Sequence, residues 1–395
     1  MKDYTQSVVN IVKSALLQKK NDNLSICFDA PLIALTKKHE ISVLIGCGIS
    51  NCGVKIDGEV KSELQKNIMM ELLLNEQQLY YIKKISEEFS EHKIDYMFLK
   101  GSVLKKLYPQ PEMRRMGDID ILIRENQYNT ITSIMKHLGY FFVRESTHEL
   151  VWRKDKVVVE LHKILVPSYN KDFYAYLGNG WERAIKIGNY EYTFKENDMF
   201  IYLFIHFAKH FRDTGIGIIH ICDLYMYMKK KKLDFAYIES VLKEIELYDF
   251  YCNIKTAIEV WFEDKKATDK TDYITSVIFN SGVYGIHENF LISSELKWKI
   301  NHKGKRRGKG CRFIRTLLPS LESMRGGYAI LSNWPILLPF FWIWRLVSKP
   351  FIKPESMKQR IKELKGIESQ TVDTYEKSLE YVGLKYNFKE NTKAW

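Results

Sequence analysis

Apolar residues recur every three or four positions at both ends of the chain, which is the pattern of amphipathic helices. Residues 1–92 carry this pattern, and its longest stretch runs over residues 60–90. The same period returns after Trp181, where it is clearest in three segments: residues 198–211, 222–230 and 236–247. We therefore expect helical regions on both sides of a different middle segment.

The middle segment has short apolar runs separated by turn residues. Five of these runs are predicted strands: residues 96–99, 119–123, 140–144, 149–153 and 156–162. A short helix is predicted to open at Gly101, and a second over residues 126–138 ends at Gly139. The order β-α-β-α-β-β-β predicts an α+β fold, in which a small mixed sheet carries helices on one face.

These changes of pattern divide the chain into three predicted parts. Residues 1–92 form an N-terminal helical region, residues 93–165 the sheet core, and residues 166–395 a helical C-terminal domain. The composition is that of a globular protein, with 46% hydrophobic and 27% charged residues, which excludes disordered and collagen-like chains.

The expected location is the cytoplasm. The six cysteines show neither C-x-x-C nor zinc-ribbon spacing, so we expect reduced thiols. Polar residues interrupt every apolar run in residues 1–20, unlike the apolar centre of a signal peptide.

The net charge of +12 suits a polyanionic ligand, a nucleic acid or an anionic membrane surface. Its densest part is the basic segment 297–315, with nine Lys and Arg and no acidic residue. Residues 326–344 are uncharged, but Pro335 and Pro339 would break a spanning helix. We expect a buried turn and a core helix there, with peripheral membrane contact through residues 297–347 as the alternative.

Carboxylates mark one face of the second predicted strand. Asp118 and Asp120 are two residues apart and point to the same side, while Ile119 and Ile121 face the core. Carboxylates held in this way repel each other unless a cation lies between them, and oxygen ligands suit Mg²⁺ (or Mn²⁺). We expect strand pairing to bring Glu160 beside them. Three carboxylates can hold two metal ions, which promote in-line displacement at phosphorus.

A candidate phosphate site precedes these carboxylates. Gly101 and Ser102 follow a strand and begin a helix, where backbone N–H groups and the hydroxyl suit a triphosphate. Neither the G-x-x-x-x-G-K-[ST] nor the G-x-G-x-x-G motif is present. Lys100, Arg114 and Arg115 are candidates for neutralising phosphate charge, and arginine can contact phosphate through two N–H groups.

Three segments resemble the uncharacterised bacterial nucleotidyltransferase family of the DNA polymerase β-like superfamily: LKGSVLKKLYP, RRMGDIDILI and VVVELH. The helical text FIYLFIHFAKHFRDTG and HICDLYMY is similar to that family's downstream part, so the resemblance covers about residues 60–350. Fifteen residues separate Ser102 from Asp118, slightly more than the general superfamily spacing and compatible with this family's Tyr-Pro loop.

The resemblance implies a metal-dependent enzyme that moves a nucleoside monophosphate from an NTP such as ATP to a hydroxyl or phosphate acceptor. It implies that Asp118 and Asp120 are shared ligands of Mg²⁺ or Mn²⁺, with Glu160 as a third ligand near the acceptor. The acceptor stays open among a small molecule, a sugar, a peptide or protein, and a nucleic acid. The alternatives are a catalytically inert nucleotide- or polyanion-binding module on the same fold and a membrane-associated protein.

Histidines near these motifs have several interpretations. His206 and His210 lie one turn apart on a predicted helix, and Asp223 follows on the next. The Glu of the metalloprotease motif H-E-x-x-H is missing. Three interpretations stay open: a transition-metal site, a packing role, and the lining of the nucleotide or acceptor cleft, which the resemblance implies. His162 shares the strand face of Glu160 and is expected to support the metal ligands.

Overall fold

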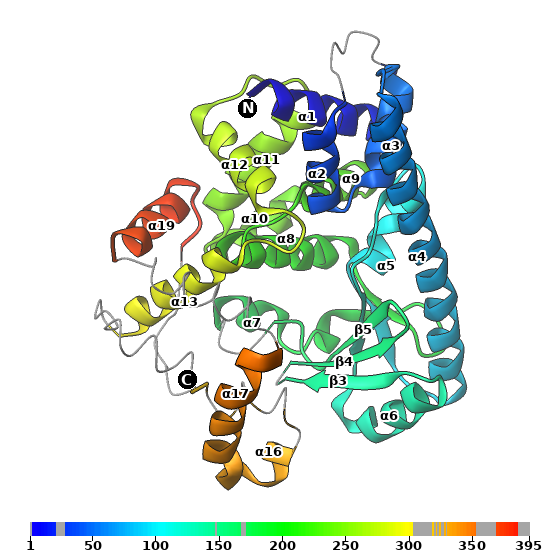
Figure 1. Cartoon of the computed structure of the whole chain (residues 1–395), viewed down its shortest axis with the longest axis vertical. Helices are drawn as coiled ribbons and strands as arrows, with labels where there is room; N and C mark the ends of the chain where they lie inside the picture. The colour runs from blue at the N-terminus through cyan, green and yellow to red at the C-terminus, as the bar shows by residue number, and fades with distance from the viewer. Residues whose placement is uncertain are drawn as a thin grey trace.

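In a computed structural model, the chain forms a five-stranded sheet surrounded by helices (Figure 1). The structure describes residues 2–20, 28–146, 148–166, 171–302, 330–352 and 369–385, with single positions between 318 and 328. The α+β fold with a small mixed sheet is confirmed.

The strand order of the sheet is β1-β2-β5-β4-β3. The strands are β1 (Tyr96–Phe98), β2 (Ile119–Ile123), β3 (Phe141–Glu145), β4 (Glu149–Lys154) and β5 (Val157–His162). β2 and β5 are parallel, whereas the other neighbouring strands are antiparallel. Because Asp120 pairs with Glu160 in the β2–β5 register, two carboxylates from distant parts of the sequence share one face.

Four helices precede the sheet: α1 (Lys2–Leu17), α2 (Ala30–His39), α3 (Ser42–Cys52) and α4 (Gly58–Glu91). The Asp57 side chain caps α4 by accepting a hydrogen bond from the Gly58 N–H. α4 runs along one side of the molecule, from the other N-terminal helices to the sheet (Figure 1).

One face of the sheet is apolar and packs on helices. Ile119, Ile121 and Val159 share a core with Ile85 and Phe89 of α4. Helix α6 (Tyr128–His137) contributes to the same core, and α5 (Gly101–Leu104) follows β1. The opposite face carries Asp120, Glu160 and His162.

The rest of the chain is mainly helical, with one small sheet that the pattern did not predict, formed by β6 (Ala184–Lys186) and β7 (Tyr192–Phe194). Its helices are α7 (Lys171–Leu177), α8 (Glu196–Asp213), α9 (Ile218–Lys230), α10 (Phe235–Glu244), α11 (Tyr248–Phe262), α12 (Asp269–Ser281), α13 (His287–Asn301), α16 (Ile330–Asn333), α17 (Leu338–Ile352) and α19 (Ser369–Tyr381). Short 3₁₀ turns are η1 (Lys105–Leu107), η2 (Pro111–Met113), η3 (Glu125–Gln127), η4 (Trp181–Arg183) and η5 (Pro335–Leu337).

A second, larger core joins the two ends of the chain. Val12 of α1 and Ile45 of α3 belong to the same apolar cluster as Phe204 of α8 and Leu242 of α10. The N-terminal and C-terminal helices therefore stabilise one another, and the domain boundaries at residues 92 and 165 stay a prediction.

The expectation of a core helix after residue 326 is wrong. A helix, α17, does form, and Pro335 and Pro339 stand in the first turns of η5 and α17, where proline is tolerated. However, Ile336 is 82% exposed and Trp344 is 55% exposed, because no described element covers this apolar face. None of the described helices has the length and apolar character needed to cross a membrane.

Only the start of the basic segment 297–315 is described. Lys297 and Lys299 of α13 form ion pairs with Asp213 and Asp373. Residues 303–315 lie outside the described residues, so the predicted role of this segment in binding an anionic acceptor or surface stays a prediction.

His39 links the N-terminal and C-terminal helices. It is fully buried, its Nε2 donates to the Phe279 carbonyl at 3.1 Å, and its Nδ1 accepts from the Ile218 N–H at 3.2 Å. This pattern requires a neutral ring, and burial lowers the pKa of His39 to about 4.

We expect His39 to make the fold acid-sensitive. The pKa of this histidine is lower in the folded state than in the unfolded chain, so stability is complete above pH 6.5 and falls as the pH drops toward 4. Over this range the wild type should lose about 3 kcal/mol more than a His39→Gln variant. Urea denaturation at several pH values measures this difference. The exposed control His137→Asn should behave as the wild type, and equal pH slopes for His39→Gln and wild type would contradict the assignment.

Candidate active site

A cavity of about 330 Å³ lies between the polar face of the sheet and helices α8 and α9. The sheet side is lined by carboxylates and two histidines: Asp118, Asp120, Glu149, Glu160, His148 and His162. The helical side carries nitrogen donors and one carboxylate: His206, Lys209, His210, His220 and Asp223. The cavity therefore places an acidic wall opposite a wall rich in nitrogen donors.

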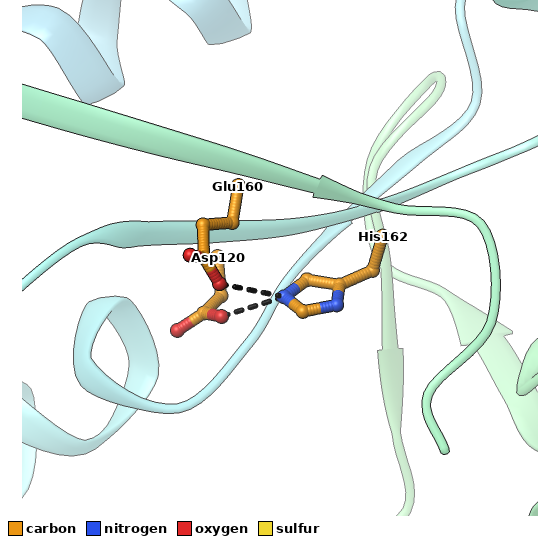
Figure 2. Close-up of side chains that lie close together, drawn as sticks. All are labelled: Asp120, Glu160 and His162. Atoms are coloured by element: carbon orange, nitrogen blue, oxygen red, sulfur yellow. Dashed lines mark hydrogen bonds and ion pairs between the residues drawn. The ribbon is translucent and has the colours of Figure 1, made fainter. Parts of the chain in front are cut away.

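Three residues of the sheet come closest together. One ligand atom each from Asp120, Glu160 and His162 lies within 4.8 Å of the others. The His162 Nε2 is 2.6 Å from the Asp120 Oδ1 and 3.8 Å from the Glu160 Oε2 (Figure 2). Asp118 lines the same cavity but is not in this closest group.

The acidic group is electrostatically strained. Burial and the neighbouring Asp120 raise the pKa of Asp118, and burial with both aspartates raises the pKa of Glu160. Burial would also raise the pKa of Asp120, but Lys100 and His162 outweigh it and hold that pKa well below its usual range. Carboxylates and one imidazole in such an arrangement form a donor set that fits a divalent cation.

Lys100 occupies a strained backbone position. Its φ is +43°, which is unfavourable for a residue other than glycine, and its ammonium donates to the Asp120 Oδ1 at 2.6 Å. The next residue, Gly101, faces the cavity, and a Cβ there would lie 2.7 Å from the Arg114 Nη1 and from the Met116 Cγ. Only glycine fits at this point.

Ser102 lies beneath the cavity wall rather than on it. Its side chain is buried, and its hydroxyl makes a weak contact of 3.8 Å with the Met116 sulfur. The structure thus brings Gly101 to the cavity surface and leaves the neighbouring hydroxyl behind it.

Arg114 is bound to helix α9. Its Nη2 donates to the Asp223 Oδ2 at 2.9 Å, and the Tyr108 hydroxyl donates to the Asp223 Oδ1 at 2.7 Å. Both members of the ion pair are buried. Arg114 and Asp223 line the cavity, but their main contact is with each other. This contact holds the Tyr-Pro loop of the sheet core against α9.

The guanidinium of Arg115 has fewer protein contacts than that of Arg114. Its Nη1 lies 2.9 Å from the Glu40 Oε1, while its Nε is buried with no hydrogen-bond partner among the described residues. The Tyr284 hydroxyl also donates to Glu40, at 3.1 Å. Arg115 lines the cavity, so its guanidinium is a candidate contact for an anionic ligand.

His206 and His210 form a pair on α8, with their Nε2 atoms 3.0 Å apart. Burial lowers the pKa of both histidines well below its usual range, so the pair is neutral. Because Asp223 is held by Arg114, these two histidines and Asp223 form no ligand group within the part of the chain that the structure describes. All three residues line the cavity, and their role in binding a nucleotide or an acceptor stays a prediction.

Several lining residues were missed from the sequence: Glu40, His148, Glu149, Lys209, His220 and Tyr284. Lys209 could have been found, because it lies one helical turn after His206 and directly before His210. Glu40 and Tyr284 carry no such signal, since only the packing of α2 near α12 brings them to the sheet core.

Comparison with known proteins identifies the family of the chain. Residues 29–263, more than half of the chain, match the model of a family described as uncharacterised nucleotidyltransferase. No curated protein matches the chain. A solution structure of the antibiotic-resistance factor ANT(2'')-Ia is 12% identical, with a TM-score of 0.33, and the match covers 45% of this chain and 95% of that one. A likeness this slight carries no argument.

We expect Arg114→Met to destabilise the fold by about 3–5 kcal/mol, because it leaves Asp223 buried without its cation. Denaturant unfolding measures the change. The double variant Arg114→Met, Asp223→Leu should be less destabilised than the sum of the single variants, and Lys61→Met, at an exposed position of α4, should be neutral. Additive losses in the double variant would show that the pair does not act as a unit.

Proposed function

The chain belongs to the uncharacterised nucleotidyltransferase family, and from this premise we propose that it moves a nucleoside monophosphate from an NTP to a hydroxyl or phosphate acceptor. The observation that carries the proposal is the group formed by Asp120, Glu160 and His162, with Asp118 in the same cavity. In this proposal the sheet core, residues 93–165, supplies the reacting wall, and the C-terminal helical domain, residues 166–395, supplies the opposite wall.

We propose that Asp118, Asp120 and Glu160 hold Mg²⁺ or Mn²⁺, since the raised pKa values of Asp118 and Glu160 indicate carboxylates that need a cation. Two bound ions would stabilise the charge on the attacking and leaving oxygens during in-line displacement. His162 keeps Asp120 oriented through the 2.6 Å contact, and Lys100 offsets part of the negative charge.

The nucleotide phosphates are proposed to lie beside Gly101 and Arg115. Gly101 lines the cavity, and its lack of a side chain lets its backbone lie against Arg114 and Met116 at this point. Arg115 lines the same cavity, and its guanidinium would contact a phosphate oxygen there. Glu160, on the opposite strand of the parallel pair, is then free to orient the acceptor hydroxyl and accept its proton.

Asp120→Asn should abolish transfer while the fold is retained. Asn keeps the shape of the side chain but loses the charge that holds the cation and pairs with Lys100. We expect pyrophosphate release and labelled product to fall more than 100-fold at saturating Mg²⁺, because metal stabilisation of the transition state is worth several kcal/mol. Labelled NTPs incubated with pooled hydroxyl and phosphate acceptors give the readout.

The control for this experiment is Glu125→Gln, an exposed carboxylate shortly after β2, which should keep full activity. Thermal melting checks that Asp120→Asn is folded. A folded Asp120→Asn protein with wild-type turnover would rule out the metal assignment. A wild type that binds NTP and forms no product with any pool would instead favour an inert nucleotide-binding module.

Arg115→Met should weaken the binding of a non-hydrolysable NTP analogue about tenfold or more, since a contact between the guanidinium and phosphate is charge-assisted. Ser102→Ala should weaken it less, because the Ser102 hydroxyl lies behind the cavity wall, and Gly101→Val should obstruct binding sterically. Isothermal titration calorimetry with Mg²⁺ measures all three. Wild-type affinity in Arg115→Met and Gly101→Val would place the phosphates elsewhere.

A further inference from the structure

Lys209 differs from the other cations that line the cavity. It lies on α8, between His206 and His210, and makes no ion pair or hydrogen bond with any residue in the described ranges. Each of the other lysines and arginines of the cavity wall is held by a carboxylate: Lys100 by Asp120, Arg114 by Asp223 and Arg115 by Glu40. Lys209 is therefore the cation of this wall that the protein itself leaves without a counter-ion.

The carboxylate nearest in sequence does not fill this role. Asp213, one turn further along α8, is bound by Lys297 at 2.8 Å and by Arg212 at 3.3 Å. Burial lowers the pKa of Lys209 to about 8, although the field of Asp213 opposes this effect. Lys209 is half-buried, and an ammonium that is partly withdrawn from water without a counter-ion is destabilised, a cost that an anion in the cavity would reduce.

The acidic wall does not reach Lys209 either. Glu149 is the acid of the sheet whose field acts on Lys209, but its carboxylate is already bound by Arg144 at 2.8 Å and by His148 at 3.5 Å. His206 and His210 donate and accept between themselves, so they add polar atoms beside Lys209 without adding charge.

Glu149 connects Lys209 with the carboxylate that is proposed to face the acceptor. The fields of Lys100 and Glu149 both act on Lys209, and Arg144 contacts Glu149 at 2.8 Å and Glu160 at 3.7 Å. Arg115 is instead paired with Glu40, to which the Tyr284 hydroxyl also donates. Lys209 is thus associated with the Glu149 and Glu160 side of the cavity rather than with Arg115.

We propose that Lys209, flanked by His206 and His210, binds an anionic group of the acceptor. The acceptor is then a hydroxyl compound that carries a phosphate or a carboxylate, and neutral or cationic acceptors are disfavoured. This inference rests on the proposed function in one respect, the assignment of the nucleotide to the Arg115 side.

The test uses the full chain saturated with a non-hydrolysable NTP analogue and Mg²⁺, so that the nucleotide phosphate site is filled. Inorganic phosphate and acetate are then titrated separately by calorimetry. We expect the wild type to bind at least one of them, Lys209→Met to bind it at least tenfold more weakly, and Lys209→Arg to stay within threefold of the wild type. The matched control is Lys195→Met, which removes an exposed charge just before α8 and should change nothing.

The two probes identify the anion. Tighter binding of phosphate indicates a phosphorylated acceptor, and tighter binding of acetate indicates a hydroxy acid. If melting shows that Lys209→Met is unfolded, Lys209→Gln takes its place in the same titrations. Equal affinity in the wild type and the Lys209→Met or Lys209→Gln variant, or no binding of either anion by the loaded wild type, would overturn the proposal.

A separate titration of the NTP analogue itself tests the assignment of the two sides. Lys209→Met should bind it within twofold of the wild type, and a tenfold loss would place Lys209 on the nucleotide and overturn the inference. These are binding measurements, so they remain informative if no transfer is found. Failure of the proposed function would appear separately, as absence of labelled product from the wild type with every NTP and acceptor pool.

Discussion

The parallel pairing of β2 with β5 forces two carboxylates to lie side by side in a buried place, and the rest of the site follows from this constraint. Asp120 and Glu160 are register partners, so neither side chain can leave the shared face without breaking the sheet. Two neighbours stabilise the Asp120 carboxylate: Lys100, in a strained backbone conformation, and His162, on the same strand as Glu160. These contacts neutralise Asp120 more effectively than Asp118 or Glu160, which leaves a demand for a further cation.

The same constraint explains why the part of the sheet that carries the carboxylates has helices packed closely on one face only. The apolar side chains of β2 and β5 alternate with the carboxylates and form a dry core with α4 and α6. An apolar helix packed directly on the charged face would bury those carboxylates without compensation. Instead α8 and α9 lie across a cavity, and the buried contacts of Asp223 with Arg114 and Tyr108 hold α9 to the sheet core.

The sequence predictions were accurate where they depended on residues close together in the chain, and they missed contacts between distant segments. β2 was predicted at its observed bounds, because alternation within five residues is a local property, and the shared face of Asp118 and Asp120 follows from the same geometry. The counter-ions of Arg114 and Arg115 could not be predicted, since Asp223 and Glu40 reach them only through the packing of distant helices. The prediction that α17 is a core helix was wrong for a related reason. Apolar periodicity shows that a helix face is suited to burial, but it does not show that the same chain buries it.

The counter-ion of each basic residue in the cavity indicates whether that residue stabilises the fold or is available to a ligand. A buried cation bound by a buried carboxylate, such as Arg114 with Asp223, has its charge satisfied by the fold and contributes to structure. A lining cation that stays partly exposed retains charge for a ligand, and Arg115 and Lys209 are both only half-buried. Because both line the cavity that holds the carboxylates, a substrate pair that brings one anionic group to Arg115 and another to Lys209 would complete the charge pattern that the fold leaves open.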